Sequence, residues 1–186
     1  YSHSAGLMEL RKGLVEKYYR KIGINITVDE LIVTVAGSES VNLALEITCN
    51  PGDEVIIPQP SYVSYLPCVQ LAYGKPVVIN LKEENQFKLT KQELLDAITD
   101  KTKVLVLPFP NNPTGAILEE EFLRDIAQVC IEKDIFVISD EIYSELTFKG
   151  RHVSIAEMDG MKERTVVING FSKSYAMTGW RIGYTA

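Results

Sequence analysis

The chain carries near its end the run Thr165-Val166-Val167-Ile168-Asn169-Gly170-Phe171-Ser172-Lys173-Ser174. Its first half is an uninterrupted apolar segment, which is typical of a strand in a sheet covered on both faces. Such a strand would deliver Lys173 to the edge of the sheet, between two serines and eight residues before Arg181. A lysine can form a Schiff base with an aldehyde, and hydroxyls with a guanidinium can bind a phosphate. The segment therefore suggests a site for a phosphorylated aldehyde, with an ordinary surface lysine as the plain alternative.

Short apolar segments of the same kind recur along the chain and alternate with segments of helical periodicity. This alternation is typical of a parallel sheet with crossover helices. We therefore expect one three-layer α/β/α domain around a mostly parallel sheet of roughly seven strands. The expected strands are 31–36, 54–57, 76–80, 104–107, 135–138, 166–168 and 182–184, and the expected helices are 7–22, 38–48, 62–72, 91–98 and 119–133.

Local signals refine the expected boundaries. Thr90 with Glu93, and Thr27 with Glu30, have the spacing of a capping box, which predicts a helix start at each threonine. The helix over 7–22 is expected to bury the stripe Leu7, Leu10, Leu14 and Tyr18. Residues 142–164 lack a regular pattern, and we expect them to cross the edge of the sheet.

Composition restricts the class of protein. The chain has 186 residues, of which 46% are hydrophobic and 24% charged, as in a soluble globular domain. A net charge of −6 without any basic run argues against a nucleic-acid surface, and no segment has the length of a membrane span or the pattern of a signal peptide. Three widely spaced cysteines predict reduced, buried thiols in a cytoplasmic protein. The two histidines lie too far apart in the sequence to suggest a metal site.

Polar residues follow the expected strands at the point where each strand ends. Gly37-Ser38-Glu39 opens a helix after the first strand, where free backbone N–H groups and the helix dipole can bind a phosphate. Asp140 follows an apolar strand, where an unpaired carboxylate would be costly. The plain alternatives are a helix N-cap for Ser38, and an N-cap or an ion pair for Asp140.

Three motifs in chain order together resemble a known family. They are Asn112-Pro113-Thr114-Gly115, Ser139-Asp140-Glu141, and Ser172-Lys173-Ser174 followed by Arg181. The chain from Tyr1 to Gly183 thereby resembles the fold-type I enzymes that use pyridoxal 5'-phosphate (PLP), and most closely the class I and II aminotransferases of the aspartate aminotransferase kind. The resemblance implies that PLP is the cofactor and that an amino group passes between an amino acid and a 2-oxo acid.

The resemblance also implies roles for single residues around the cofactor ring. Lys173 would form the aldimine and act as general base at the substrate, with its pKa lowered by desolvation and by nearby Arg181. Asp140 would pair with the protonated ring nitrogen and so maintain the ring as an electron sink.

Three further side chains are implied around the same ring. Asn112 and Tyr143 would reach the phenolic oxygen, and Tyr62 would stack on the ring face. Taken alone, Asn112 could belong to a simple β-turn, and Tyr62 could be a core or interface tyrosine. Tyr65 is interpreted as such a core or interface residue, and Glu141 as a structural residue near the end of the sheet.

The phosphate would lie against two segments. Gly37, Ser38 and Glu39 would form its cup, although the Glu39 carboxylate must point away from an anion. Ser172 and Arg181 would complete the site from the other side. The resemblance also implies that Tyr1 reaches the phosphate of a partner subunit, which predicts a homodimer.

The ends of the chain suggest a piece of a longer protein, because the sequence opens without a methionine and stops in a strand-like segment. We expect residues 1–186 to be the PLP-binding large domain, with the N-terminal arm and the C-terminal small domain absent. Substrate recognition by carboxylate-binding residues would lie mostly in those parts, so aspartate is a guess, and aromatic or alanine-type donors stay open. Carbon–sulfur lyases and decarboxylases use the same scaffold. A fragment that binds PLP without turnover is a further alternative.

Overall fold

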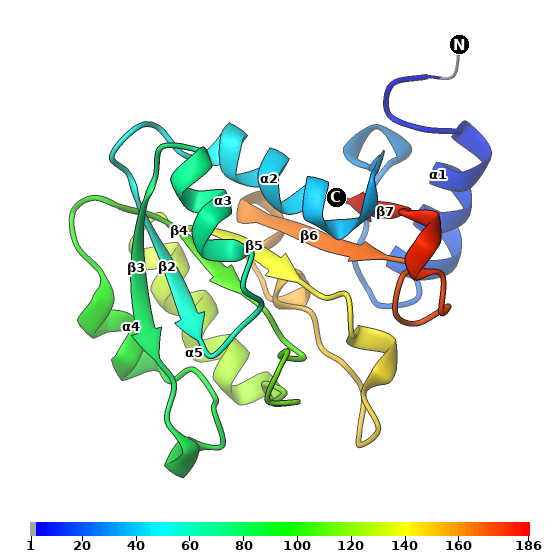
Figure 1. Cartoon of the computed structure of the whole chain (residues 1–186). Coiled ribbons are helices and arrows are strands. Elements are labelled where there is room, and N and C mark those ends of the chain that lie inside the picture. Colours follow the sequence, from blue (N-terminus) through cyan, green and yellow to red (C-terminus); the bar gives the residue numbers. More distant parts are fainter. Residues whose placement is uncertain (1–2) are drawn as a thin grey trace.

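The computed structural model of the chain describes residues 3–186, so Tyr1 lies outside the described residues. Figure 1 shows one twisted sheet with helices packed against both of its faces. The strands are β1 (Ile32–Thr34), β2 (Glu54–Gln59), β3 (Lys75–Asn80), β4 (Thr102–Leu107), β5 (Phe136–Asp140), β6 (Thr165–Gly170) and β7 (Gly183–Thr185). The α-helices are α1 (Met8–Leu14), α2 (Ala36–Thr48), α3 (Tyr65–Leu71), α4 (Lys91–Ala97) and α5 (Glu120–Glu132).

The strand order is β1-β7-β6-β5-β4-β2-β3. The strands from β6 to β3 pair in parallel, whereas β7 lies antiparallel between β1 and β6. This confirms the expected α/β architecture with a mostly parallel sheet. Because β7 runs against its neighbours, its first residue, Gly183, pairs with Thr34 at the end of β1 and with Gly170 at the end of β6. The segment that enters β7 therefore lies at the same edge of the sheet as the carboxyl ends of the other strands.

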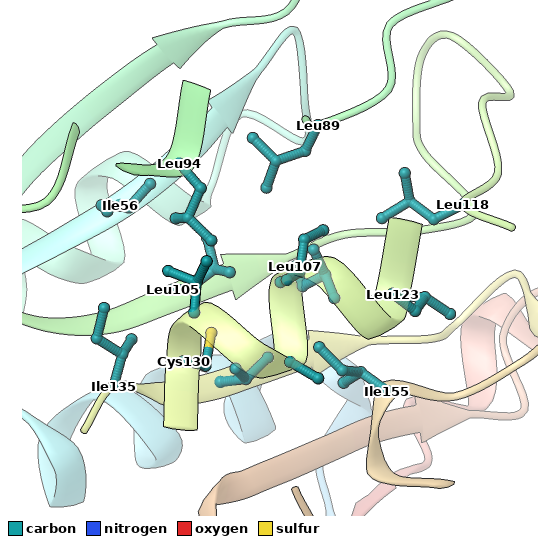
Figure 2. Close-up of a cluster of buried hydrophobic side chains, with 14 of the residues drawn as sticks. Ile56, Leu89, Leu94, Leu105, Leu107, Leu118, Leu123, Cys130, Ile135 and Ile155 are labelled. Atoms are coloured by element: carbon teal, nitrogen blue, oxygen red, sulfur yellow. The ribbon is translucent and has the colours of Figure 1, made fainter. Parts of the chain in front are cut away.

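Alternate side chains of the central strands enter two separate cores. Val55 and Ile57 of β2 pack with α2 and α3 on one face, and Ile56 packs with α4 and α5 on the other. Figure 2 shows the second core, in which Leu94 of α4 and Leu123 of α5 lie close to β4. Burial on both faces explains why these strands are apolar throughout rather than alternating.

The helix expected over 7–22 is formed over 8–19, but its second part is not α-helical. After α1 the chain continues as a π-helical turn over Val15–Tyr19. This wider turn contains more residues than an α-turn, so the buried stripe shifts. Leu14, Val15 and Tyr19 are buried, whereas Leu7 is 60% exposed.

The first strand is shorter than expected, and α2 begins two residues earlier. Ala36 adopts a φ of 61° and already belongs to the helix, whose N-cap is Val35. Ser38 is therefore the third helical residue, and the alternative that made it the N-cap is wrong. The change brings Gly37 and Ser38 together into the first turn of α2.

The two capping boxes have different outcomes. Thr90 accepts a hydrogen bond from the Glu93 N–H and opens α4, as predicted. The Thr27–Glu30 box is also formed, but it closes only a single 3-10 turn over Val28–Glu30. The helix start predicted at Thr27 is therefore confirmed only as this short 3-10 turn, since the chain extends into β1 directly afterwards.

Residues 142–164 cross a face of the sheet rather than its edge. They connect β5 to the adjacent parallel strand β6 through short 3-10 turns. Ile155 and Met161 from this segment are buried in the same core as α5. Their burial corrects the expectation of an edge crossing, since an irregular segment can still supply core residues.

The thiols follow the prediction only in part. Cys49, Cys68 and Cys130 are free, but only Cys130 is buried, and burial raises its pKa to about 12. Within residues 3–186, no helix is long and apolar enough to cross a membrane. The same described residues contain no group of three or more His, Cys, Asp or Glu side chains that could hold a metal ion.

Candidate functional site

A cavity of about 220 Å³ opens at the edge of the sheet where the carboxyl ends of the parallel strands meet. Parallel sheets typically bind ligands in this position. Most of the side chains that the sequence singles out line this cavity. They are Gly37, Ser38, Tyr62, Asn112, Asp140, Tyr143, Ser172, Lys173 and Arg181.

The cavity wall at α2 carries a set of groups suited to an anion. Gly37 and Ser38 lie in the first helical turn, whose backbone N–H groups have no partner within the helix. Ser172, Thr178 and Arg181 line the cavity as well. Hydroxyls, a guanidinium and a helix N-terminus all favour negative charge.

One hydrogen bond joins the segment before β7 to the start of α2, and a second stabilises the segment itself. The Ala36 N–H donates to the Arg181 carbonyl over 3.1 Å, and the Arg181 guanidinium donates to the Thr178 carbonyl over 3.1 Å. Gly183 permits this close approach, because a Cβ there would lie 2.4 Å from the Ala36 carbonyl carbon. The lack of a side chain at Gly183 thus fixes the distance between Arg181 and the helix N-terminus.

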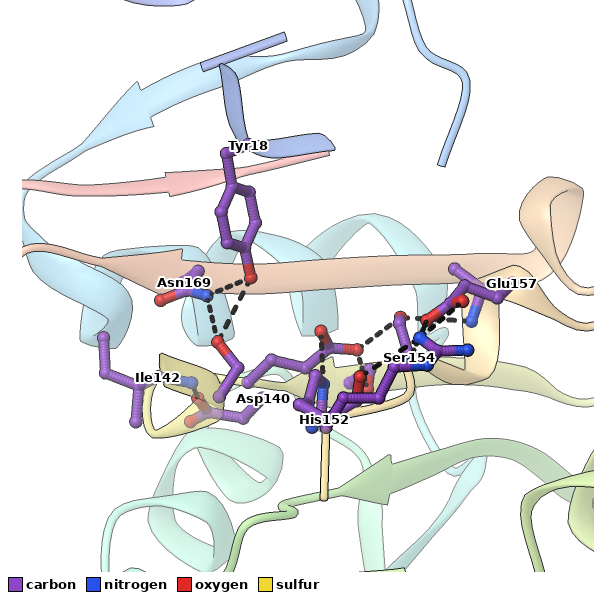
Figure 3. Close-up of polar contacts among 12 residues, drawn as sticks. Tyr18, Asp140, Ile142, His152, Ser154, Glu157 and Asn169 are labelled. Atoms are coloured by element: carbon purple, nitrogen blue, oxygen red, sulfur yellow. Dashed lines mark hydrogen bonds and ion pairs between the residues drawn. The ribbon is translucent and has the colours of Figure 1, made fainter. Parts of the chain in front are cut away.

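Asp140 is the last residue of β5, and its carboxylate is buried. Oδ2 accepts a hydrogen bond from the Tyr65 hydroxyl at 2.7 Å, and Oδ1 accepts one from the Ile142 N–H at 3.2 Å. Figure 3 shows the second of these contacts, between Asp140 and Ile142. Burial raises the pKa of Asp140, against the lowering effect of the two hydrogen bonds. Both donors are neutral, so the acid has no cation to balance it.

Lys173 stands in the same cavity without a carboxylate partner. Neither Lys173 nor Asp140 forms an ion pair with any residue from 3 to 186. The Lys173 ammonium lies 5.7 Å from the centroid of the Tyr143 ring, within the range of a cation–π contact. Lys173 is exposed in this chain.

The loop after β4 places Asn112 in the lining of the cavity, whereas the side chain of the preceding residue, Asn111, forms hydrogen bonds within the loop. Asn111 is buried, and its Oδ1 accepts hydrogen bonds from the Thr114 N–H and the Thr114 hydroxyl. These two hydrogen bonds from Thr114 close the loop locally. Asn112 is exposed and lines the cavity with its side chain free of such contacts in the described chain.

Glu141 lies beside Asp140 in sequence but belongs to a separate structural cluster. Its fully buried carboxylate accepts from Ser139 Oγ at 2.9 Å and from Ser154 Oγ at 2.5 Å, and it pairs with His152 Nε2 at 2.9 Å. Figure 3 shows that Ser154 and His152, which both contact this carboxylate, lie close together. The expected structural role of Glu141 is confirmed, and it explains the position of His152, to which the sequence assigned no role.

One candidate residue lies outside the cavity, and two residues with hydroxyl groups in its lining were not predicted from the sequence. The Glu39 carboxylate accepts from the Val35 N–H and lines a different groove, as its expected orientation away from an anion requires. Tyr65 and Thr178 line the cavity without having been candidates. Tyr65 follows Tyr62 by almost one helical turn, which is a signal that could have paired the two rings, whereas Thr178 lies in a segment without a pattern.

Comparisons with known proteins agree with this geometry. The family described as "Aminotransferase class I and II" matches residues 1–186. The chain is 47% identical to an aspartate aminotransferase of Bacillus subtilis and 43% identical to an aromatic-amino-acid aminotransferase of Thermococcus litoralis, covering 100% of this chain and 48% of each relative. The solved structure of an aromatic aminotransferase from Pyrococcus horikoshii superposes with a TM-score of 0.97 at 44% identity, covering 100% of this chain and 50% of that one.

The sheet, the cavity and the match along the whole chain define a class of enzyme scaffold. The chain belongs to the class I and II aminotransferase family. It spans about half the length of the curated relatives that it matches.

Proposed function

We propose that the chain is the cofactor-binding large domain of a PLP-dependent aminotransferase, which transfers an amino group between an amino acid and a 2-oxo acid. One observation carries the proposal: Lys173 and the buried Asp140 line one cavity, and neither has a charged partner within residues 3–186. A lysine and an acid left free at the two sides of a cavity favour a ligand that satisfies both.

The chemistry of the cavity fits PLP. The buried Asp140 carboxylate has only neutral donors, and a protonated ring nitrogen would supply the missing positive charge. Gly37, Ser38, Ser172, Thr178 and Arg181 would hold the phosphate through N–H groups, hydroxyls and a guanidinium. Tyr62 would stack on the ring, and Asn112 with Tyr143 would donate to its phenolic oxygen.

The bound cofactor supplies an electron sink for the negative charge that develops at the substrate α-carbon. Lys173 would hold the cofactor at its aldehyde, and the Lys173 amine would move the proton at the substrate α-carbon as general base. Asp140 would keep a proton on the ring nitrogen. Tyr62 would fix the plane of the ring, and Arg181 would hold its phosphate end.

Substrate choice rests on the relatives alone. The two relatives described above are an aspartate aminotransferase and an aromatic-amino-acid aminotransferase. We favour aspartate as the substrate because the first of these two is the more similar in sequence. A second candidate, a chain that binds PLP without turnover, is favoured by the exposure of Lys173 and by the 41% exposure of Tyr62. Both side chains would need cover from outside this chain to form a water-excluded site.

We further propose a homodimer in which Tyr1 reaches the phosphate of the partner subunit. Residues 1–186 would be the large domain, and a small domain would close over the cavity. The three free cysteines favour the cytoplasm, where thiols stay reduced.

A trapping experiment tests the proposal. The purified protein is mixed with equimolar PLP, reduced with borohydride and digested, and the modified peptide is identified by mass spectrometry. We expect the label on Lys173 and its loss in Lys173→Ala. Lys103→Ala is the matched control, since Lys103 also lies over an aromatic ring, 5.2 Å from the Phe136 centroid, but does not line the cavity. Labelling that is spread over surface lysines and unaffected by Lys173→Ala would refute PLP binding at this site.

A further inference from the structure

Tyr65 makes the only side-chain hydrogen bond to Asp140 found among residues 3–186. It is the first residue of α3, it is 3% exposed, and its hydroxyl donates to Asp140 Oδ2 over 2.7 Å. The two residues lie 75 positions apart in sequence, on different elements. The Tyr65 ring also packs edge-to-face on Tyr62, with centroids 5.7 Å apart. Tyr65 thus touches both the acid and the ring proposed to stack on the cofactor.

We propose that Tyr65 is a positioning residue that sets the proton affinity of Asp140, and through it how firmly the ring nitrogen of a bound cofactor is held protonated. Only the effect of Tyr65 on the ring nitrogen rests on the proposed function. The effect of Tyr65 on the proton affinity of Asp140 concerns two residues of this chain and can be tested without any cofactor.

The hydrogen-bond inventory of the carboxylate carries the argument. Each oxygen receives one donor, with the Ile142 N–H on Oδ1 and the Tyr65 hydroxyl on Oδ2. The Ile142 N–H could be removed only by proline, which would also restrict the backbone, so the Tyr65 hydroxyl is the donor that can be changed without altering the chain path. A hydrogen bond to a carboxylate stabilises its charged form and makes it a weaker base. Tyr65 therefore limits the basicity that burial would otherwise give to Asp140.

The other charged or titratable groups around Asp140 do not replace this contact. The carboxylate of Glu141 is directed to Ser154 and His152, although its charge acts to raise the pKa of Asp140. Tyr143, Lys173 and Arg181 line the cavity but form no hydrogen bond to Asp140 in the described chain. Burial and the neighbouring Asp140 raise the pKa of Tyr65 well above its ordinary value, so its hydroxyl stays a donor.

The first test measures Asp140 directly in cofactor-free protein. Aspartate labelled with ¹³C at the side-chain carboxyl is titrated by NMR, and Asp140→Asn identifies the resonance. In Tyr65→Phe we expect the pKa of Asp140 to rise by about one unit, since a hydrogen bond to a charged group is lost. Tyr73→Phe makes the same chemical change at a 75% exposed tyrosine outside the cavity and should leave that pKa unchanged. An unchanged Asp140 pKa in Tyr65→Phe overturns the inference.

A second substitution is expected to change the pKa of Asp140 in the opposite direction. Site-specific incorporation of 3-fluorotyrosine at position 65 makes the hydroxyl a stronger donor with little change in size, so the pKa of Asp140 should fall. A fall here with a rise in Tyr65→Phe is not expected from a packing role alone. If both variants shift it in the same direction, Tyr65 acts through packing and the proposal fails.

The third test adds PLP labelled with ¹⁵N in its ring. In Tyr65→Phe the ring nitrogen should stay protonated to a higher pH, by about the shift seen at Asp140, because a more basic carboxylate holds the proton more firmly. An unshifted ring nitrogen together with a shifted Asp140 would overturn the link between them. Failure of the proposed function has a different signature, namely loss of the borohydride label at Lys173 while the cofactor-free titration still gives its result.

Discussion

Asp140→Asn is expected to stabilise the cofactor-free protein and, at the same time, to reduce amino-group transfer by the full-length protein strongly. The carboxylate is buried against two neutral donors and no cation among residues 3–186. An amide can keep both contacts, because its oxygen can accept from Ile142 and its NH₂ can donate to the Tyr65 hydroxyl. Removing an uncompensated buried charge in this way should raise the free energy of unfolding by about 1–3 kcal/mol.

The pH dependence of this gain follows from the direction of the pKa shift. Burial raises the pKa of Asp140 in the folded chain above its ordinary value. The contribution of Asp140 to stability is therefore most favourable below the unfolded pKa and is lost as the pH rises through the raised folded pKa. Asn does not titrate, so the stability difference between the variant and the parent should be small at low pH and grow as the pH rises. Urea unfolding from about pH 4 to pH 8 measures it, and a difference that is independent of pH would contradict the account.

The same substitution removes the charge that would pair with the ring nitrogen. Breaking a buried ion pair costs about 3–5 kcal/mol, so amino-group transfer by the full-length enzyme should fall by about a thousand-fold. Borohydride labelling at Lys173 should persist, because that bond does not require Asp140. Retention of nearly full activity in Asp140→Asn would show that the acid does not act on the cofactor.

Gly183→Ala is expected to be the most destabilising change of a single methyl group in the site. The new Cβ would lie 2.4 Å from the Ala36 carbonyl carbon and 2.6 Å from the Gly37 nitrogen, both of which are backbone atoms that cannot rotate away. Relief requires β7 and the start of α2 to separate. Overpacking of this kind costs about 3 kcal/mol or more, and it should also weaken binding of inorganic phosphate at the wall of the cavity.

Gly179→Ala provides the matched control for this change. It lies four residues earlier in the same segment, and a Cβ there would meet no atom within 4 Å. Urea unfolding should show a large loss of stability for Gly183→Ala and little change for Gly179→Ala, and phosphate binding by calorimetry should follow the same order. Equal effects of the two substitutions would mean that the contact with α2 is not the cause.

The central strands of the sheet could be predicted from the sequence alone, because burial on both faces restricts their residues locally. Where β4 and β5 are buried on both faces, over 104–107 and 137–138, their residues are apolar without alternation, and that pattern is visible without a structure. The residues gathered at the cavity follow from the same rule, since polar residues after parallel strands meet at one edge. Family resemblance then supplied their proposed roles.

Features that depend on distant contacts could not be predicted in the same way. The π-helical turn after α1 shifts the buried stripe without any marker in the local sequence. The contact between Tyr65 and Asp140 joins residues whose pairing depends on how α3 packs against β2 and β3 of the sheet. The expected desolvation of Lys173 assumed a closed site, whereas the side chain is exposed in this chain.

The position of β7 has a consequence for the order in which the protein can fold. Within the described sheet β1 pairs with no strand except β7, although the two lie far apart in the sequence. Until Gly183–Thr185 has been inserted beside it, β1 lacks its paired strand and the start of α2 lacks the carbonyl of Arg181. Pairings between segments so far apart in the chain form late, because a long loop must be closed first. We therefore expect the hydrophobic centre of this sheet to assemble before the anion-binding wall is completed.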